Sequence, residues 1–206
     1  MYLPKSFQIE DLVELQAFMR AYNFASLVTQ HAGAPFASHL PFLLDAQRGP
    51  QGTLLAHMAR ANPQWRHFAS GKETLAVFWG PHAYISPAWY DTPNQVPTWN
   101  YETVHAYGTA RIVEDAAGAL AILRRLVETY EGGFQTPWTM ENLPAGHAEG
   151  MTRGIVAFEI EITRLEGKAK LSQNKTVKDR ENAASMLESF GGQDNTRTAA
   201  LMRATI

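Results

Sequence analysis

The chain has 206 residues, 45% of them hydrophobic and 18% charged, which excludes a largely disordered or fibrous protein and is enough for one domain with a full core. The 18 Lys and Arg residues against 20 Asp and Glu give a formal charge of -2, so no overall basic field attracts nucleic acid or an anionic membrane. Because cysteine is absent, disulfides, thiol nucleophiles and cysteine-ligated metal centres are excluded.

The N-terminal segment lacks a basic stretch followed by a continuous apolar run, which a secretory signal would carry. No stretch approaches the roughly 20 apolar residues of a membrane span. We therefore expect a cytoplasmic protein that does not bind a membrane.

The first half of the chain predicts one helix followed by strands. The expected elements are a helix over 9–22, strands over 24–29, 35–44 and 53–58, and a short helix over 62–69. Gly33 lies in the short connection between the first two strands, as is typical of a hairpin. Asn62-Pro63 predicts the start of the short helix, because Asn caps helices well and Pro is tolerated in their first turn.

The second half predicts more strands, with helices between and after them. The expected elements are strands over 74–79, 82–86, 98–113 and 154–163, and helices over 115–130, 176–189 and 196–204. Gly80-Pro81 separates two of these strands, and the Pro-rich segment 87–97 is expected to be a structured loop. The polar segment 168–175 is interpreted as a turn after the last strand.

Short strands with a few helices among them indicate an α+β, mainly β fold, a small antiparallel barrel decorated by helices. Gly191-Gly192 breaks the helical pattern near the end of the chain. We therefore expect one barrel domain over 1–190 and a short C-terminal helical extension over 191–206.

The common catalytic signatures are missing. The sequence has no Gly-x-Gly-x-x-Gly after a strand, no Walker lysine motif and no Gly-x-Ser-x-Gly elbow. None of the seven histidines forms a His-x-x-x-His pair, so we expect no metal centre, and catalytic residues stay unassigned.

Two clusters suggest a phosphorylated planar ligand. His57, Arg60 and Asn62 lie at a predicted strand-to-helix turn, where free backbone N–H groups favour an anion. The alternative is a satisfied strand histidine beside a solvated arginine. A second cluster flanks the Pro-rich loop with aromatic rings, on which a flat ligand could stack unless they belong to the core: Trp89, Tyr90, Trp99 and Tyr101.

Five segments together resemble one family. They are Ser38-His-Leu-Pro-Phe42, Ala56-His-Met-Ala-Arg-Ala-Asn-Pro-Gln-Trp65, Tyr84-Ile-Ser-Pro-Ala-Trp-Tyr90, Val96-Pro-Thr-Trp-Asn-Tyr101 with Val104-His-Ala-Tyr-Gly108, and Lys170-Leu-Ser-Gln-Asn174. In this order, over residues 1–187, they resemble the PaiB-type FMN-binding negative transcriptional regulators. The resemblance implies an FMN-binding split barrel of the pyridoxamine-phosphate-oxidase-like superfamily, and a homodimer with the flavin near its interface.

The resemblance also implies cofactor residues. The segment 56–62 occupies the place where this superfamily holds the FMN phosphate, which assigns His57, Met58, Arg60 and Asn62. The segment 38–41 would run along the flavin ring and offer backbone groups, which assigns Ser38, His39, Leu40 and Pro41. The residues expected to close over the ring or reach it from the partner subunit are Trp99, Asn100, Lys170 and Gln173.

The function implied by the resemblance is regulatory, through the state of the flavin or through a partner. Direct DNA binding stays possible but has little support from charge, because the only concentrated basic stretch, 168–180, is offset by Asp179 and Glu181. One alternative is an FMN-dependent flavin reductase or oxidase. A minor alternative is a haem-binding split-barrel protein whose axial ligand is one of His39, His57, His82 or His105.

Overall fold

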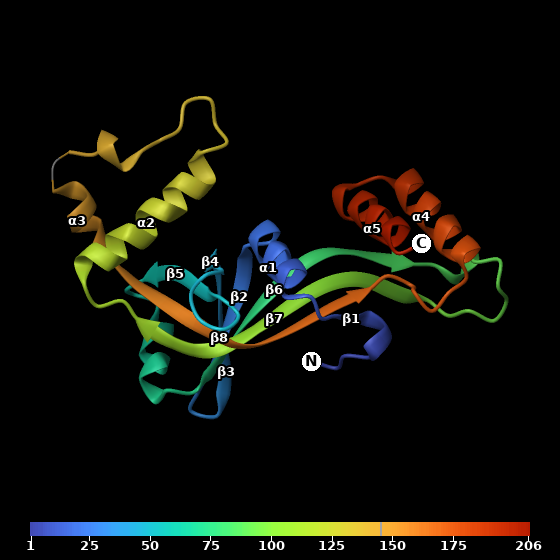
Figure 1. The fold of residues 1–206 in the computed structure, drawn as a ribbon, viewed down its shortest axis with the longest axis horizontal. Coiled ribbons are helices and arrows are strands. Elements are labelled where there is room, and N and C mark those ends of the chain that lie inside the picture. Colours follow the sequence, from blue (N-terminus) through green and yellow to red (C-terminus); the bar gives the residue numbers. More distant parts are fainter. Residues whose placement is uncertain (145) are drawn as a thin grey trace. The chain divides into compact units, whose positions relative to one another are not determined.

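The computed structural model describes residues 1–144 and 146–206, with the side chain of residue 149 outside the description (Figure 1). Eight strands form one sheet in the order β3-β2-β6-β7-β8-β5-β4, and β1 pairs with β8. Their bounds are β1 Gln8–Ile9, β2 Phe24–His31, β3 Ala34–Pro41, β4 Leu43–Asp45, β5 Thr53–Ala59, β6 Glu73–Ile85, β7 Thr98–Ile112 and β8 Ile155–Lys170. The pairs β1–β8, β2–β3, β2–β6, β4–β5 and β5–β8 are antiparallel, which confirms the predicted fold class.

Helices lie before, between and after the strands. The α-helices are α1 Leu12–Ala21, α2 Ala116–Glu131, α3 His147–Thr152, α4 Val177–Phe190 and α5 Gln193–Ala204. The short 3-10 helices are η1 Lys5–Phe7, η2 Pro63–Ser70, η3 Pro87–Trp89 and η4 Met140–Asn142. Among the described residues, no helix combines the length and the apolar character needed to cross a membrane.

The chain divides into two compact units. Unit 1 comprises residues 1–18, 79–105 and 166–206, and unit 2 comprises residues 19–78 and 106–165. The long strands β6, β7 and β8 each have residues in both units.

Unit 2 has an aromatic core under its strands. The ring of Phe42 lies 5.9 Å from that of Phe78 and 6.2 Å from that of Phe158, measured between centroids. A second apolar cluster joins Leu55 of β5 to Leu126 on the buried face of α2. These contacts bury large apolar areas, which is the main source of stability for the unit.

Unit 1 has its own core, built mainly by its C-terminal helices. Figure 1 shows α4 and α5 side by side. Leu187 of α4 and Met202 of α5 pack with Ile85 of β6 in one buried cluster. The Asp179 carboxylate, 1% exposed, accepts hydrogen bonds from the backbone N–H groups of Asp91 (2.8 Å) and Thr92 (3.2 Å), so it fixes the start of the loop after η3.

Two predicted strand boundaries were wrong. The strands expected at 74–79 and 82–86 are one continuous strand, β6, because Gly80 is not a turn residue. A Cβ atom at Gly80 would lie 2.8 Å from the Phe18 ring, so the missing side chain makes room for that ring. The strand expected at 35–44 divides into β3 and β4 at Phe42, whose side chain is 2% exposed in the core.

The end of the last strand was also misplaced. β8 continues to Lys170, so Lys168 and Lys170 lie on a strand and not in the predicted turn. Antiparallel pairing of Gln8 with Lys168 and Ile9 with Gly167 extends the sheet there. The N-terminal strand β1 that provides this pairing is only two residues long, and its Ile9 was wrongly assigned to the predicted helix 9–22, which begins at Leu12.

Candidate functional site

Two of the predicted cofactor segments meet in unit 2 through Asn62. Its side-chain oxygen accepts a hydrogen bond from the backbone N–H of Gln64 (3.0 Å), which caps η2 as predicted. Its Nδ2 donates to Oγ of Ser38 on β3 (2.8 Å). The structure therefore brings the segment 38–41 and the segment 56–62 together at this point.

Arg60 is fixed by the chain but keeps donors available. Its Nε donates to the carbonyl oxygen of Arg153 (2.9 Å) and its Nη2 to that of Ile155 (2.7 Å). A guanidinium has five N–H donors, and within the described ranges the others have no acceptor. Arg60 is exposed, so these donors can reach an anion from solvent.

The other predicted residues of unit 2 differ in what they can offer. Nδ1 of His57 is buried and has no hydrogen-bond partner in the described part of the chain, and burial lowers the pKa of this imidazole. The side chain of Met58 is 2% exposed in the core, so only its backbone can face a ligand. On the edge strand β3, Nδ1 of His39 lies 2.9 Å from Oγ of Ser26, and Leu40 and Pro41 are half-buried.

Three of the four predicted residues of unit 1 are engaged within the chain. Asn100, fully buried, donates to Oγ of Ser172 (3.0 Å). Lys170 donates to the carbonyl oxygen of Trp99 (2.7 Å), and the Gln173 side chain closes its own turn by donating to the carbonyl oxygen of Ala169 (2.6 Å). The fourth residue, Trp99, has a side chain that is 53% exposed and available to a ligand.

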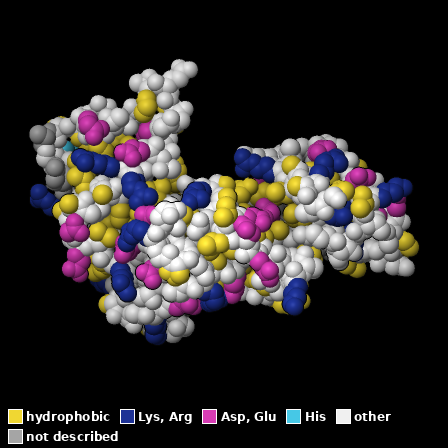
Figure 2. All heavy atoms as spheres, in the orientation of Figure 1, with side chains coloured by type: hydrophobic (Ala, Val, Ile, Leu, Met, Phe, Trp, Pro, Cys, Tyr) yellow, Lys and Arg dark blue, Asp and Glu magenta, His cyan; other side chains and the backbone are white. Residues whose placement is uncertain are grey.

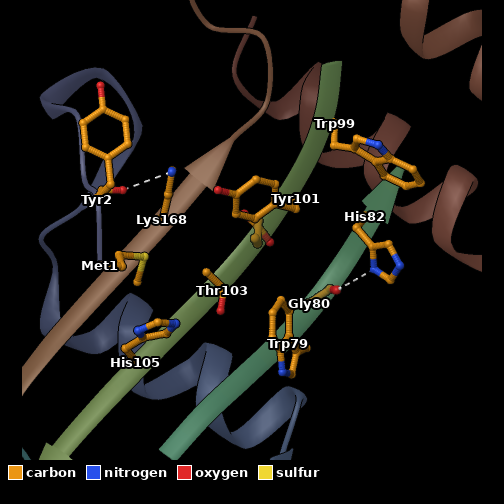
Figure 3. Close-up of a pocket in the computed structure, with 11 residues that line it drawn as sticks. Met1, Tyr2, Trp79, Gly80, His82, Trp99, Tyr101, Thr103, His105 and Lys168 are labelled. Atoms are coloured by element: carbon orange, nitrogen blue, oxygen red, sulfur yellow. Dashed lines mark hydrogen bonds between the residues drawn. The ribbon is translucent and has the colours of Figure 1, made fainter. Parts of the chain in front are cut away.

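The largest described cavity of unit 1 is an aromatic pocket of about 560 Å³, shown in Figure 3. Trp99, Tyr101, Thr103 and His105 alternate along one face of β7 and line it. Trp79 and His82 contribute from β6, Tyr2 from the N-terminal segment and Lys168 from β8. We call this cavity the aromatic pocket.

Lys168 is the buried cationic side chain of the aromatic pocket, whose lining also includes the buried residue Glu102. It is 7% exposed, and its ammonium donates to the carbonyl oxygen of Tyr2 (3.1 Å). The ammonium also lies 5.5 Å from the centre of the Tyr2 ring and 5.2 Å from that of Tyr101, within the range of cation–π attraction (Figure 3). Within the described residues it forms no ion pair with a carboxylate.

Sequence reasoning missed most of the aromatic pocket. Of its lining residues, Trp99 was assigned to the flavin and Tyr101 was named as a ring on which a flat ligand could stack, His82 and His105 entered only as alternative haem ligands, and Lys168 was placed in a turn. The alternation of Trp99, Tyr101, Thr103 and His105 was a usable signal, since period-two spacing places these side chains on one face. Tyr2 gave no such signal, because only the fold brings it beside β8.

Arg60 and His57 each offer a group suited to the phosphate of a planar phosphorylated cofactor, but among the described residues no hydrogen bond joins them, and Arg60 lines a cavity that includes Glu114 and Asp115 and not His57. A guanidinium with unused N–H groups and a buried, unpartnered imidazole nitrogen are suited to hydrogen bonding with a phosphate. In the described residues, no group of three or more His, Asp or Glu side chains is arranged to hold a metal ion.

Comparisons with known proteins identify the family. Residues 1–164 match the family described as "Putative FMN-binding domain". The chain is 36% identical over 204 residues to the protease synthase and sporulation protein PAI 2 of Bacillus subtilis, covering 98% of this chain and 96% of that protein.

Two solved structures resemble the chain in fold. The flavocytochrome Anf3 of Azotobacter vinelandii superposes with a TM-score of 0.62 at 16% identity, covering 79% of this chain and 69% of that one. The FAD and heme binding protein of Mycobacterium smegmatis superposes with a TM-score of 0.59 at 13% identity, covering 90% and 80%. At such low sequence identity, the similarity shows the fold alone. The fold is the expected split barrel. The chain therefore belongs to the PaiB-type FMN-binding family, and FMN is its cofactor.

Proposed function

We propose that this protein is a regulator of the PaiB type that acts through the state of its bound FMN or through a partner protein, and not by reading DNA directly. The observation that carries the proposal is that the basic side chains of the stretch 168–180 bind to other residues of the same chain. DNA recognition needs Lys and Arg side chains that are free to neutralise phosphates. Here these side chains have intrachain partners.

Each basic residue of the stretch has such a partner. Lys168 bonds to Tyr2, Lys170 to Thr98 and Trp99, Lys175 to Gln95, Lys178 to Asp91 and Arg180 to Thr205. Over α4 and α5, basic and acidic side chains lie interspersed on the face seen in Figure 2. This arrangement supports regulation without a DNA-reading surface on unit 1.

For the flavin we propose Arg60, His57 and the linked pair Asn62 and Ser38 as the phosphate end of the site. Bound FMN supplies hydride and single-electron chemistry. Arg60 would bind the phosphate through its unused N–H groups, and His57 would add a hydrogen bond from its unpartnered nitrogen. The backbone of residues 38–41 would lie along the ring, with His39, Leu40 and Pro41 beside it.

We include a homodimer in the proposal, with the flavin near its interface and Trp99 reaching it from the partner subunit. The side chain of Trp99 is 53% exposed and of a kind enriched in protein interfaces. Light scattering of the FMN-bound protein is expected to give twice the chain mass of 22.9 kDa. A species of single-chain mass contradicts this part of the proposal.

The cofactor site is tested by titrating FMN and riboflavin into the protein and its Arg60→Met variant. A charge-assisted hydrogen bond to phosphate contributes about 1.5–3 kcal/mol, so Arg60→Met should weaken FMN binding roughly 10- to 100-fold. Riboflavin has no phosphate, so its affinity should stay the same, which also shows that the variant is folded. Arg66→Met, an exposed arginine of η2, is the matched control and should bind FMN normally. Equal FMN affinity in all three proteins overturns the phosphate assignment.

The mode of action is tested with the FMN-bound protein in its oxidised and reduced states. We expect no sequence-selective DNA retention at about 150 mM salt in either state, because the basic side chains of the stretch 168–180 have intrachain partners. We also expect no steady-state consumption of NADH or NADPH. Selective retention that Lys178→Glu weakens would favour direct DNA reading, and sustained turnover would favour a flavin reductase.

A further inference from the structure

The aromatic pocket contains a cation that the chain itself leaves incompletely compensated. Lys168 is 7% exposed, yet its only hydrogen-bond acceptor among the described residues is the neutral carbonyl oxygen of Tyr2. An ammonium removed from water loses its hydration, and a single carbonyl restores little of it. The faces of Tyr2 and Tyr101 compensate in part. An anionic group placed beside Lys168 would complete its environment.

The walls of the pocket define the rest of the ligand. Trp79 is 58% exposed although it lines the pocket, so its ring face is available. Figure 3 shows Tyr101 between Lys168 and the β6 side of the pocket, with His105 further along β7. Aromatic side chains favour a flat apolar body, and about 560 Å³ is within the range of small-molecule pockets.

We propose that the aromatic pocket is a binding site for a flat aromatic carboxylate, separate from the FMN phosphate site. The carboxylate binds the Lys168 ammonium, and the ring lies against Trp79 and Tyr101. A cationic ligand is disfavoured because Lys168 repels it. A dianionic phosphate is a poorer match than a monoanion, because Lys168 is the only Lys or Arg that lines the pocket in the described part of the chain, and the N-terminal ammonium of Met1, which also lines it, is paired with Glu166.

Three naphthalene probes of equal shape test the charge requirement. The FMN-saturated protein is titrated with 2-naphthoate, 2-naphthamide and 2-(aminomethyl)naphthalene, and binding is followed by calorimetry. We expect 2-naphthoate to bind at least about tenfold more tightly than the amide, and the amine to bind most weakly. Equal affinities, or no binding of 2-naphthoate at millimolar concentration, overturn the proposal.

Two variants locate the site. Lys168→Met should reduce the affinity for 2-naphthoate to that for the amide and leave the amide unchanged, whereas Lys178→Met, an exposed lysine of unit 1 outside the pocket, should change neither. Trp79→Ala should weaken both probes by a similar factor, with Trp138→Ala of unit 2 as its control. If Lys168→Met does not fold, the wild-type probe series and Trp79→Ala still decide the question.

The inference does not depend on the proposed function. Because the titrations use FMN-saturated protein, a probe that binds without releasing FMN supports a separate site. If 2-naphthoate binds only to FMN-free protein and is displaced by FMN, the pocket belongs to the flavin and the proposal is overturned. Retained FMN in that case leaves the family assignment intact.

Discussion

Among single residues, Glu102 is the carboxyl group that the fold perturbs most clearly. Its side chain is 8% exposed, and burial, followed by the charge of Glu14, raises its pKa from the ordinary 4.5 to about 7. The folded state therefore holds a proton that the unfolded state releases between these values. Stability falls as the pH rises from 4.5 to 7, and the full cost is present above pH 7.

Replacing Glu102 by Gln should remove this pH dependence. A pKa difference of this size corresponds to roughly 3 kcal/mol, so Glu102→Gln should stabilise the protein by up to that amount at pH 8 and by little at pH 4.5. Urea unfolding at the two pH values measures the effect. Glu10→Gln, at an exposed position of unit 1, is the control and should leave the difference unchanged. An equal effect of Glu102→Gln at both pH values would contradict the assignment.

For single residues, the sequence allowed us to predict which polar side chains matter, but not which groups they bind. Asn62 was predicted both as a helix cap and as a cofactor residue. The cap is confirmed, and it was predictable because its hydrogen-bond partner, Gln64, is only two residues away in the sequence. Its bond to Ser38 joins positions 24 residues apart, which spacing alone cannot show. Lys170 and Gln173 have structural partners that only the packed turn provides.

Among the elements, β7 and β8 approach so closely at Gly108 that no side chain fits there. A Cβ atom at this position would lie 2.1 Å from the backbone oxygen of Glu161. Because a backbone atom in a sheet cannot move aside cheaply, Gly108→Ala should destabilise the protein by about 1–3 kcal/mol or more. Urea unfolding gives the value, with Gly133→Ala as control, since nothing lies within 4 Å of its Cβ. A loss as small as that of the control would show that the strands separate readily.

The order of most helices and strands was predictable, but β1 and α3 were not expected, and exact lengths were less predictable. The helix 115–130 and the strand 98–113 were predicted to within a residue or two, because periodic apolar spacing defined them. β6 was divided at Gly80-Pro81 because those residue types usually mark turns. The tertiary contact between Gly80 and Phe18 overrides that local preference.

In the whole molecule, each unit has a core of its own, and α5 contributes to the core of unit 1. Ala199 and Met202 are fully buried there, and Nδ2 of Asn100 donates to the Met202 sulfur (3.3 Å). The predicted boundary at residue 190 stays a prediction. These contacts suggest that a chain ending there would expose Leu187 and leave Asn100 without one of its partners.

The dependence of unit 1 on α5 is measurable by truncating a single side chain. Met202→Ala should cost about 2–5 kcal/mol, as for other buried large-to-small changes, whereas Met186→Ala on the exposed side of α4, 37% exposed, should cost under about 0.5 kcal/mol. In hydrogen exchange of Met202→Ala, the backbone amides of α4 and α5 should lose protection first. Local unfolding starts there because this cluster has lost its contacts. If Met202→Ala is as mild as Met186→Ala, the last helix is a separable extension and the boundary at 190 is supported. If it is costly, the barrel and its C-terminal helices have to be treated as one folding unit.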